Sequence, residues 1–249
     1  MSDEALASRM AAQIATWQTT GDRRSIFLSC YSMMTHNMFA GVTAGRFADR
    51  EWVYQLIHNF ADYYFVALDA YEAQQPTLPQ VWRLAYDMAR QPDTPVVQSL
   101  LLGVNAHINH DLVLVLADML GPEWADLPPS KREERHRDYC EVNAVIAETT
   151  DRVQDEVVEP YARMMNLIDV MCGPLDEWCT SKLLRNWRAD VWQQAIQIVE
   201  HPDQATRHTL RQQADLLALR RIELLRDSGN VGARVFGYPL RWLGRLRML

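Results

Sequence analysis

Apolar side chains recur every three to four residues along most of the 249-residue chain, which is the period of an amphipathic α-helix. Glycine and proline are sparse and stand between the periodic segments, where they mark the ends of elements. The pattern predicts helices at residues 3–18, 24–44, 50–74, 79–91, 95–120, 130–158, 161–172, 175–200, 204–227 and 234–247. No run alternates apolar and polar residues around a hairpin turn, so we expect no sheet.

Several predicted helix ends have a physical cause. Ser130 and Glu133 fit a capping box, in which both side chains satisfy free amide groups of the first turn. Pro79 and Pro95 suit the first turn, where the missing N–H costs nothing. Asp203 has the side chain of a good N-cap.

The helices are expected to form one domain. No fixed-period repeat is visible, and the longest polar connection, 121–129, is too short for a flexible linker. We therefore expect an all-α, single-domain bundle of roughly eight to ten helices around a buried central helix at about 95–120. This helical domain should span residues 1–228, with 229–249 as a basic amphipathic segment packed on it.

The central helix carries the most informative residues. Its apolar side chains lie nearly all round the helix: Val96, Val97, Leu100, Leu101, Leu102, Val104, Ile108, Leu112, Val113 and Leu116. Four polar side chains interrupt them in the middle turns, at Asn105, His107, Asn109 and Asp111, whereas His110 is expected at the polar edge. Burying so many polar groups is costly unless each of them has a partner.

Two interpretations of this cluster remain open. His107 and Asp111 are four residues apart, so their side chains should touch inside the bundle, and so should those of Asn105 and Asn109. In the functional interpretation, His107 is a catalytic acid or base that Asp111 orients, and the asparagines bind substrate. In the structural interpretation, the same groups form a satisfied network that determines helix packing.

The string Leu-Leu-Leu-Gly-Val-Asn-Ala-His-Ile-Asn-His-Asp-Leu at residues 100–112 resembles the motif of an uncharacterised bacterial family, a domain of unknown function. That motif reads approximately L-L-L-G-x-N-A-H-I-N-x-D-L. Softer matches cover most of residues 27–200: 45–49, Trp52, 60–71, Trp82, Ala85, Asp138, Asn143, Arg188 and Trp192. The resemblance implies a helical fold and supplies no activity.

Further candidates lie outside the central helix. Arg188 and Trp192 are four residues apart, so an arginine held against a tryptophan face would bind a carboxylate or phosphate, or else Arg188 pairs with Asp111. Aromatic residues such as Tyr64 would line a ligand pocket or pack the core. The candidate substrate-binding residues are therefore Asn105, Asn109, Arg188, Trp192 and Tyr64.

Metal and cofactor motifs are weak or missing. His107 and Asp111 would supply two metal ligands, with His36 or His58 as a third, but no fourth ligand is evident. The sequence has no G-x-G-x-x-G, Walker or G-x-S-x-G motif. We therefore expect neither a metal nor a cofactor.

Charge and segment composition limit the partners. A net charge of −7 argues against general nucleic-acid binding. Residues 229–249 hold several arginines among apolar residues and no acid, so this segment would lie on an anionic membrane or pair with the acidic body. The N-terminal residues do not resemble a secretory signal, and no apolar run reaches the ~20 residues that span a bilayer. The sequence therefore predicts a cytoplasmic protein without a transmembrane segment.

The leading hypothesis is a cofactor-independent acid–base enzyme of the cyclase, lyase, isomerase or hydrolase type, acting on a small apolar molecule. Its catalytic residues would be His107 and Asp111. The alternatives are a non-catalytic helical module that binds a ligand or partner, and a metal-dependent hydrolase. The sequence does not indicate an oligomeric state.

Overall fold

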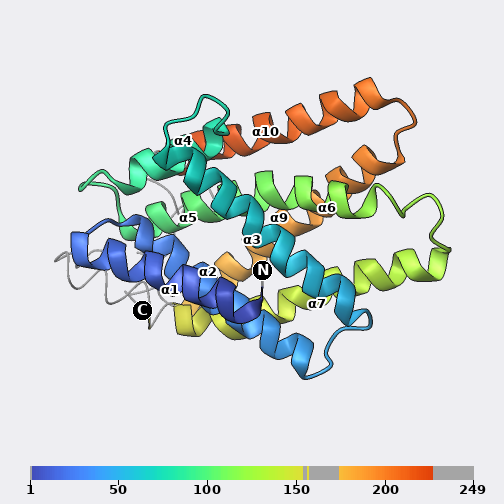
Figure 1. The fold of residues 1–249 in the computed structure, drawn as a ribbon, viewed down its shortest axis with the longest axis horizontal. Helices are drawn as coiled ribbons and strands as arrows, with labels where there is room; N and C mark the ends of the chain where they lie inside the picture. Colours follow the sequence, from blue (N-terminus) through green and yellow to red (C-terminus); the bar gives the residue numbers. More distant parts are fainter. Residues whose placement is uncertain (1, 154–155, 157–173, 227–249) are drawn as a thin grey trace, which may run out of the picture.

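The computed structural model describes residues 2–153, 156 and 174–226, and this part of the chain is helical, without strands (Figure 1). The helices are α1 (Asp3–Thr20), α2 (Arg24–Thr43), α3 (Arg50–Glu72), α4 (Gln80–Ala89), α5 (Val96–Ala106), η1 (His107–Asp111), α6 (Leu112–Leu120), α7 (Pro129–Val153), α9 (Pro174–Glu200) and α10 (Gln204–Arg226). The predicted all-α, single-domain fold is confirmed.

The observed helix ends lie within a few residues of the predicted ones. Asp203 caps α10 as expected, because its carboxylate accepts a hydrogen bond from the amide of Thr206 at 2.7 Å. The helices predicted at 161–172 and 234–247, the end of the one predicted at 130–158, and the basic segment 229–249 lie outside the described residues.

The central helix predicted at 95–120 is a rod of three elements in sequence, α5, η1 and α6. In Figure 1 the rod lies in the middle of the molecule, with α10 along its upper side and α7 below it. The rod contacts α2, α3, α4, α9 and α10. By length and composition, Gln98–Leu120 could cross a membrane, but most of it is buried inside the bundle, which is consistent with the core helix of a soluble protein.

The apolar core has two halves that meet near η1. One half packs around α5 and includes Trp82 and Leu102, and the other packs around α6 and includes Leu116 and Trp192. Phe60 and Ile108 pack against both halves. The polar residues of the central rod therefore lie at the junction of the two apolar clusters.

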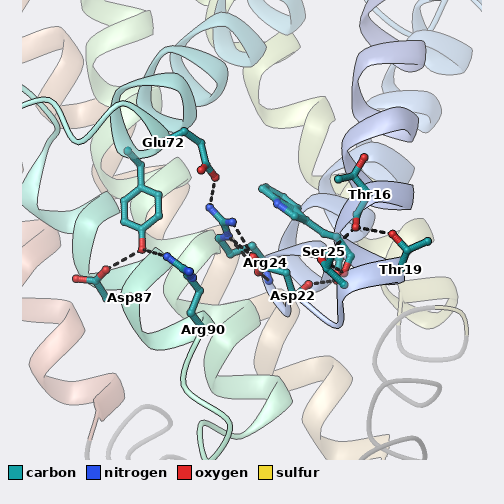
Figure 2. A network of polar contacts seen from close by, with 11 residues as sticks. Thr16, Thr19, Asp22, Arg24, Ser25, Glu72, Asp87 and Arg90 are labelled. Atoms are coloured by element: carbon teal, nitrogen blue, oxygen red, sulfur yellow. Dashed lines mark hydrogen bonds and ion pairs between the residues drawn. The ribbon is translucent and has the colours of Figure 1, made fainter.

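A polar network joins α1, α2, α3 and α4 near one end of the bundle (Figure 2). The buried guanidinium of Arg24 donates hydrogen bonds to the carboxylates of Asp22 and Glu72. The hydroxyl of Tyr71 on α3 donates to Asp87 on α4 at 2.8 Å. The first of these networks joins the start of α2 to the end of α3, and the second joins α3 to α4.

The start of α3 is held by α7. The carboxylate of Asp138 accepts hydrogen bonds from the amides of Ala48 and Asp49, at 2.8 and 2.7 Å. Asp49 in turn caps α3 by accepting from the amide of Trp52 at 3.0 Å. Asp49, Trp52 and Asp138 are positions of the resemblance noted above, and each contributes here to the placement of α3.

Candidate functional site

Residues His107–Asp111 form one π-helical turn between α5 and α6. The amide of Leu112 accordingly bonds to the carbonyl of His107, five residues earlier. Single π turns within α-helices are rare and frequently occur at functional sites. This turn brings His107, Asn109, His110 and Asp111 together in the interior, and all four are buried.

Asp111 is the centre of the polar cluster. Its carboxylate is 1% exposed and accepts hydrogen bonds from Nδ1 of His107 at 2.9 Å and Nδ1 of His110 at 2.7 Å. Nε1 of Trp82 on α4 donates to both carboxylate oxygens, at 3.0 and 3.1 Å. Burial alone would raise the pKa of Asp111, but the bonds from the two histidines outweigh it and hold the pKa below its usual range. Asp111 is therefore ionised.

The contact between His107 and Asp111 agrees with their spacing in the sequence. Burial lowers the pKa of His107, and the bond to Asp111 opposes this only in part, so the imidazole is neutral at neutral pH. Because the ionised Asp111 can only accept, Nδ1 of His107 must donate to it, and we assign the proton of the neutral ring to Nδ1. Nε2 then carries a lone pair, and this buried atom has no hydrogen-bond partner among the residues that the structure describes.

His107 lines an apolar cavity of about 130 Å³ between α2, α3, the central rod, α7 and α9. The ring of Phe60 stacks on the imidazole with centroids 3.5 Å apart and planes 6° apart. Tyr31 meets the same imidazole edge-on at 4.3 Å, and Phe27, Met34 and other apolar side chains complete the wall. An apolar cavity of about this size holds a molecule such as benzene.

Two hydroxyl groups lie in the same wall. Those of Tyr31 and Thr35 are close to each other, but neither makes a hydrogen bond of normal geometry to the part of the chain that the structure describes. Burial raises the pKa of Tyr31 well above its usual value, so its hydroxyl keeps its proton. Burial also raises the pKa of the Cys30 thiol to about 12, which makes Cys30 a poor nucleophile. The polar atoms of the cavity are therefore suited to hydrogen bonding and proton transfer.

His110 belongs to the cluster, so the expectation that it lies at a polar edge is wrong. Its Nε2 lies 2.7 Å from a carboxylate oxygen of Asp215 on α10. Burial would lower the pKa of His110, but Asp111 and Asp215 outweigh it and raise the pKa to about 9. His110 is thus positively charged at neutral pH. Sequence reasoning missed Asp215, because nothing in the pattern places α10 beside η1.

Asn105 and Asn109 link the central rod to α10 by hydrogen bonds. Nδ2 of Asn105 donates to the carbonyl of Ala218 at 2.9 Å, and Nδ2 of Asn109 donates to Oδ1 of Asn105 at 2.9 Å. Arg221 donates to Oδ1 of Asn109 and forms an ion pair with Asp190 at 2.9 Å. Neither asparagine lines the cavity beside His107. Their contacts hold α10, and with it Asp215, against the central rod.

Arg188 lines the cavity but does not contact Asp111. Its Nε donates to Asn143 at 2.8 Å, and its Nη2 donates to the carbonyl of Tyr139 at 2.7 Å. The guanidinium lies 4.2 Å from the centroid of the Tyr139 ring instead of packing on Trp192. The expected pairing with Asp111 is therefore wrong, because the helix α7 supplies the partners of Arg188.

The other two predicted binding residues do not line the cavity. Trp192 packs against Trp124, His136 and Tyr139, in the core half around α6. Tyr64 is fully buried, and its ring centroid lies 5.9 Å from that of His107. Tyr64 thus supports the wall of the site from outside.

The described residues contain no group of three or more His, Cys, Asp or Glu side chains arranged to hold a metal ion. Of the suggested third ligands, His58 instead bonds to Asp3 at 2.9 Å. The thiols of Cys30 and Cys140 are free.

Gly103 on α5 is needed for the shape of the cavity. A Cβ atom at this position would lie 2.5 Å from the ring of Phe27, which lines the cavity and lies 5.8 Å from the His107 ring. We expect Gly103→Ala to lower the free energy of unfolding by about 1–3 kcal/mol in urea denaturation, because Phe27 has to move. Gly41→Ala is the control: its Cβ would meet Phe47 at 3.3 Å, and a loss as large as that of Gly103→Ala would contradict this explanation.

The comparison with known protein families found a family whose matched segment contains the whole site. The family of unknown function DUF5995 matches residues 4–228. No curated protein and no solved structure matches the chain. The resemblance to an uncharacterised family is thus confirmed for nearly the entire described chain, and it supplies no activity. The protein belongs to the family of unknown function DUF5995.

Proposed function

We propose that the protein is a cofactor-independent acid–base enzyme that acts on a small, largely apolar molecule in the cavity beside His107. One observation carries this proposal: His107 lines the cavity, its Nδ1 is bonded to a buried carboxylate, and its buried Nε2 has no partner among the described residues. An aspartate that orients a histidine in this way is a recurring arrangement for a general base.

The proposed step is a proton transfer. Nε2 of neutral His107 accepts a proton from an acidic O–H, N–H or activated C–H group of the substrate, and the adjacent Asp111 stabilises the imidazolium that forms. The protonated hydroxyl of Tyr31 is available to donate a hydrogen bond to a substrate oxygen. Because the thiol of Cys30 is held protonated, proton transfer is favoured over covalent catalysis.

The cavity restricts the substrate to small molecules. Its volume of about 130 Å³ is well below that of pockets that bind drug-sized ligands, which are roughly 300–1,000 Å³. Its wall is mostly aromatic and aliphatic, with the few polar atoms described above. The substrate class is therefore a single ring or a short branched chain with one acidic hydrogen and one further polar group.

The second candidate is a helical module that binds such a molecule without reaction, and the same apolar wall favours it. The two candidates differ in the fate of a bound molecule that carries a removable proton. Benzisoxazole is a suitable probe: a base removes its C–H proton, its N–O bond breaks, and 2-cyanophenolate forms, which is detected by its ultraviolet absorption. The reaction needs a base and no other co-reactant.

We expect the wild-type protein to open benzisoxazole with saturation kinetics, and His107→Asn to reduce kcat/KM by about 10²–10⁴-fold. Asparagine keeps a donor where Nδ1 bonds to Asp111 and removes Nε2, so the fold should survive. The matched control is His208→Asn, at an exposed histidine of α10, which should react like the wild type.

The outcomes separate the two candidates. Saturable binding of benzisoxazole without ring opening favours the binding module. Equal rates for the wild type and His107→Asn, or a wild type that neither binds nor converts the probe, would refute the proposed base.

A further inference from the structure

The cluster continues beyond Asp111 toward the surface. The two carboxylate oxygens of Asp111 bond to different imidazoles: Oδ2 to His107 and Oδ1 to His110. The second nitrogen of His110 then contacts Asp215 at 2.7 Å. The four side chains form a continuous row, which begins at the apolar cavity and ends on α10.

The far end of this row opens on a second hollow. His110 and Asp215 both line a cleft of about 380 Å³ between the start of α4 and α10, together with Gln80 and Gln212. His110 is buried at 4% exposure, whereas the side chain of Asp215 is 47% exposed. His107 does not line this cleft, and His110 does not line the apolar cavity. The row thus connects the buried apolar cavity to a surface cleft.

The two histidines of the row differ in charge. His110 contacts two carboxylates, and its pKa is raised to about 9, whereas His107 contacts one, and its pKa is lowered by burial. The charge on His110 also lowers the pKa of His107. A single buried carboxylate cannot fully compensate two adjacent imidazolium ions. The state in which only one of the two histidines, His107 or His110, is protonated is therefore favoured.

Other titratable groups around the row leave this balance intact. Burial raises the pKa values of Cys30 and Tyr31 on α2, Tyr63 and Tyr64 on α3, and Tyr86 on α4, so all five are neutral near pH 7. On α9, Arg188 is bonded to Asn143 and Tyr139, and on α10, Arg221 is bonded to Asn109 and Asp190. Both arginines have partners other than the row.

We propose that His110 and Asp215 form the proton exit of the site: when His107 accepts a proton from the substrate, His110 releases its Nε2 proton to Asp215 and the water of the cleft. One proton enters the row and one leaves it, so one of the two imidazoles is charged before the step and one is charged after it. When His107 returns its proton to the product, His110 takes one up from the cleft. This inference rests on the proposed role of His107 as the base.

The test is a pH titration of the histidine side chains by NMR, which needs no ligand. The chain has seven histidines, and His107→Asn and His110→Gln assign the two signals of the row. In Asp215→Asn we expect the His110 midpoint to fall below about 9, because the variant removes one of the two carboxylates that raise it. In His110→Gln the His107 midpoint should rise, because the variant removes the charge that lowers the pKa of His107. Glu223→Gln removes an exposed charge from the same helix, and as the control it should move neither midpoint.

An unchanged His110 midpoint in Asp215→Asn, or an unchanged His107 midpoint in His110→Gln, would overturn the proton exit. Should His110→Gln fail to fold, Asp215→Asn still decides, because this half-exposed position keeps its shape. The benzisoxazole assay distinguishes the two proposals. If the protein opens benzisoxazole but the midpoints do not shift, His107 remains the proposed base and the proton exit through His110 and Asp215 is rejected. If the midpoints shift but benzisoxazole is not opened, the role of His107 as a base is rejected.

Discussion

Replacing Asp111 by asparagine is expected to lower the free energy of unfolding by about 3–5 kcal/mol. The carboxylate is buried and accepts bonds from His107, His110 and Trp82. Asparagine has one acceptor oxygen, and its NH₂ group would face a donor. The variant also leaves the charge on His110 with only Asp215 as a partner. Urea denaturation at neutral pH measures the loss.

The control for this variant is Asp126→Asn, at an exposed turn, which should stay within about 0.5 kcal/mol of the wild type. Adding His110→Gln to Asp111→Asn should recover part of the loss, since it removes the uncompensated charge. A loss below about 1 kcal/mol for Asp111→Asn would show that the cluster is not a buried charge centre.

The second large effect is a loss of stability on the alkaline side. The pKa of His110 is about 9 in the folded protein, against an ordinary value of 6.5. Because the folded value is the higher one, this stabilisation is complete below pH 6.5 and disappears as the pH rises through about 9. The difference corresponds to about 3 kcal/mol. Urea midpoints measured across this window should therefore decrease with pH.

His110→Gln is the matched variant for this prediction, and its stability should change little across the same window. A wild type with the same flat profile would show that His110 is not held in its charged form.

On the acid side the sign of the pH dependence is reversed, because it arises from His107. Its pKa is lowered in the fold, so the unfolded chain binds the proton more readily, and stability falls as the pH drops below 6.5.

The proposed base differs from an ordinary core histidine in its second nitrogen. Buried polar atoms in proteins are nearly always satisfied. Among the described residues, three polar atoms of the cavity wall have no partner of normal geometry: Nε2 of His107 and the hydroxyls of Tyr31 and Thr35. A ligand that supplied those bonds would remove a cost of about 1–3 kcal/mol per group. The cavity and the cluster are therefore parts of one site.

Local interactions explain why most helices could be predicted from the sequence. Helical periodicity and end signals such as Asp203 depend on neighbouring residues, so the pattern alone placed the helix ends within a few residues. The all-round apolar character of residues 95–120 predicted the buried rod. The contact between His107 and Asp111 could be predicted for the same reason, because residues four apart on a helix are neighbours.

Only the tertiary structure decided the partners of these residues. Trp82 and Asp215, which complete the cluster, come from helices far away in the sequence, and α7 rather than Asp111 engages Arg188. The π turn changes the direction of His110 within five residues, which is too short a stretch for a period to reveal. The cavity is formed by side chains of α2, α3, the central rod, α7 and α9, which lie far apart in the sequence. Packing between distant segments depends on how side-chain shapes fit together in three dimensions. The pattern of apolar and polar residues along the chain holds no information about this fit.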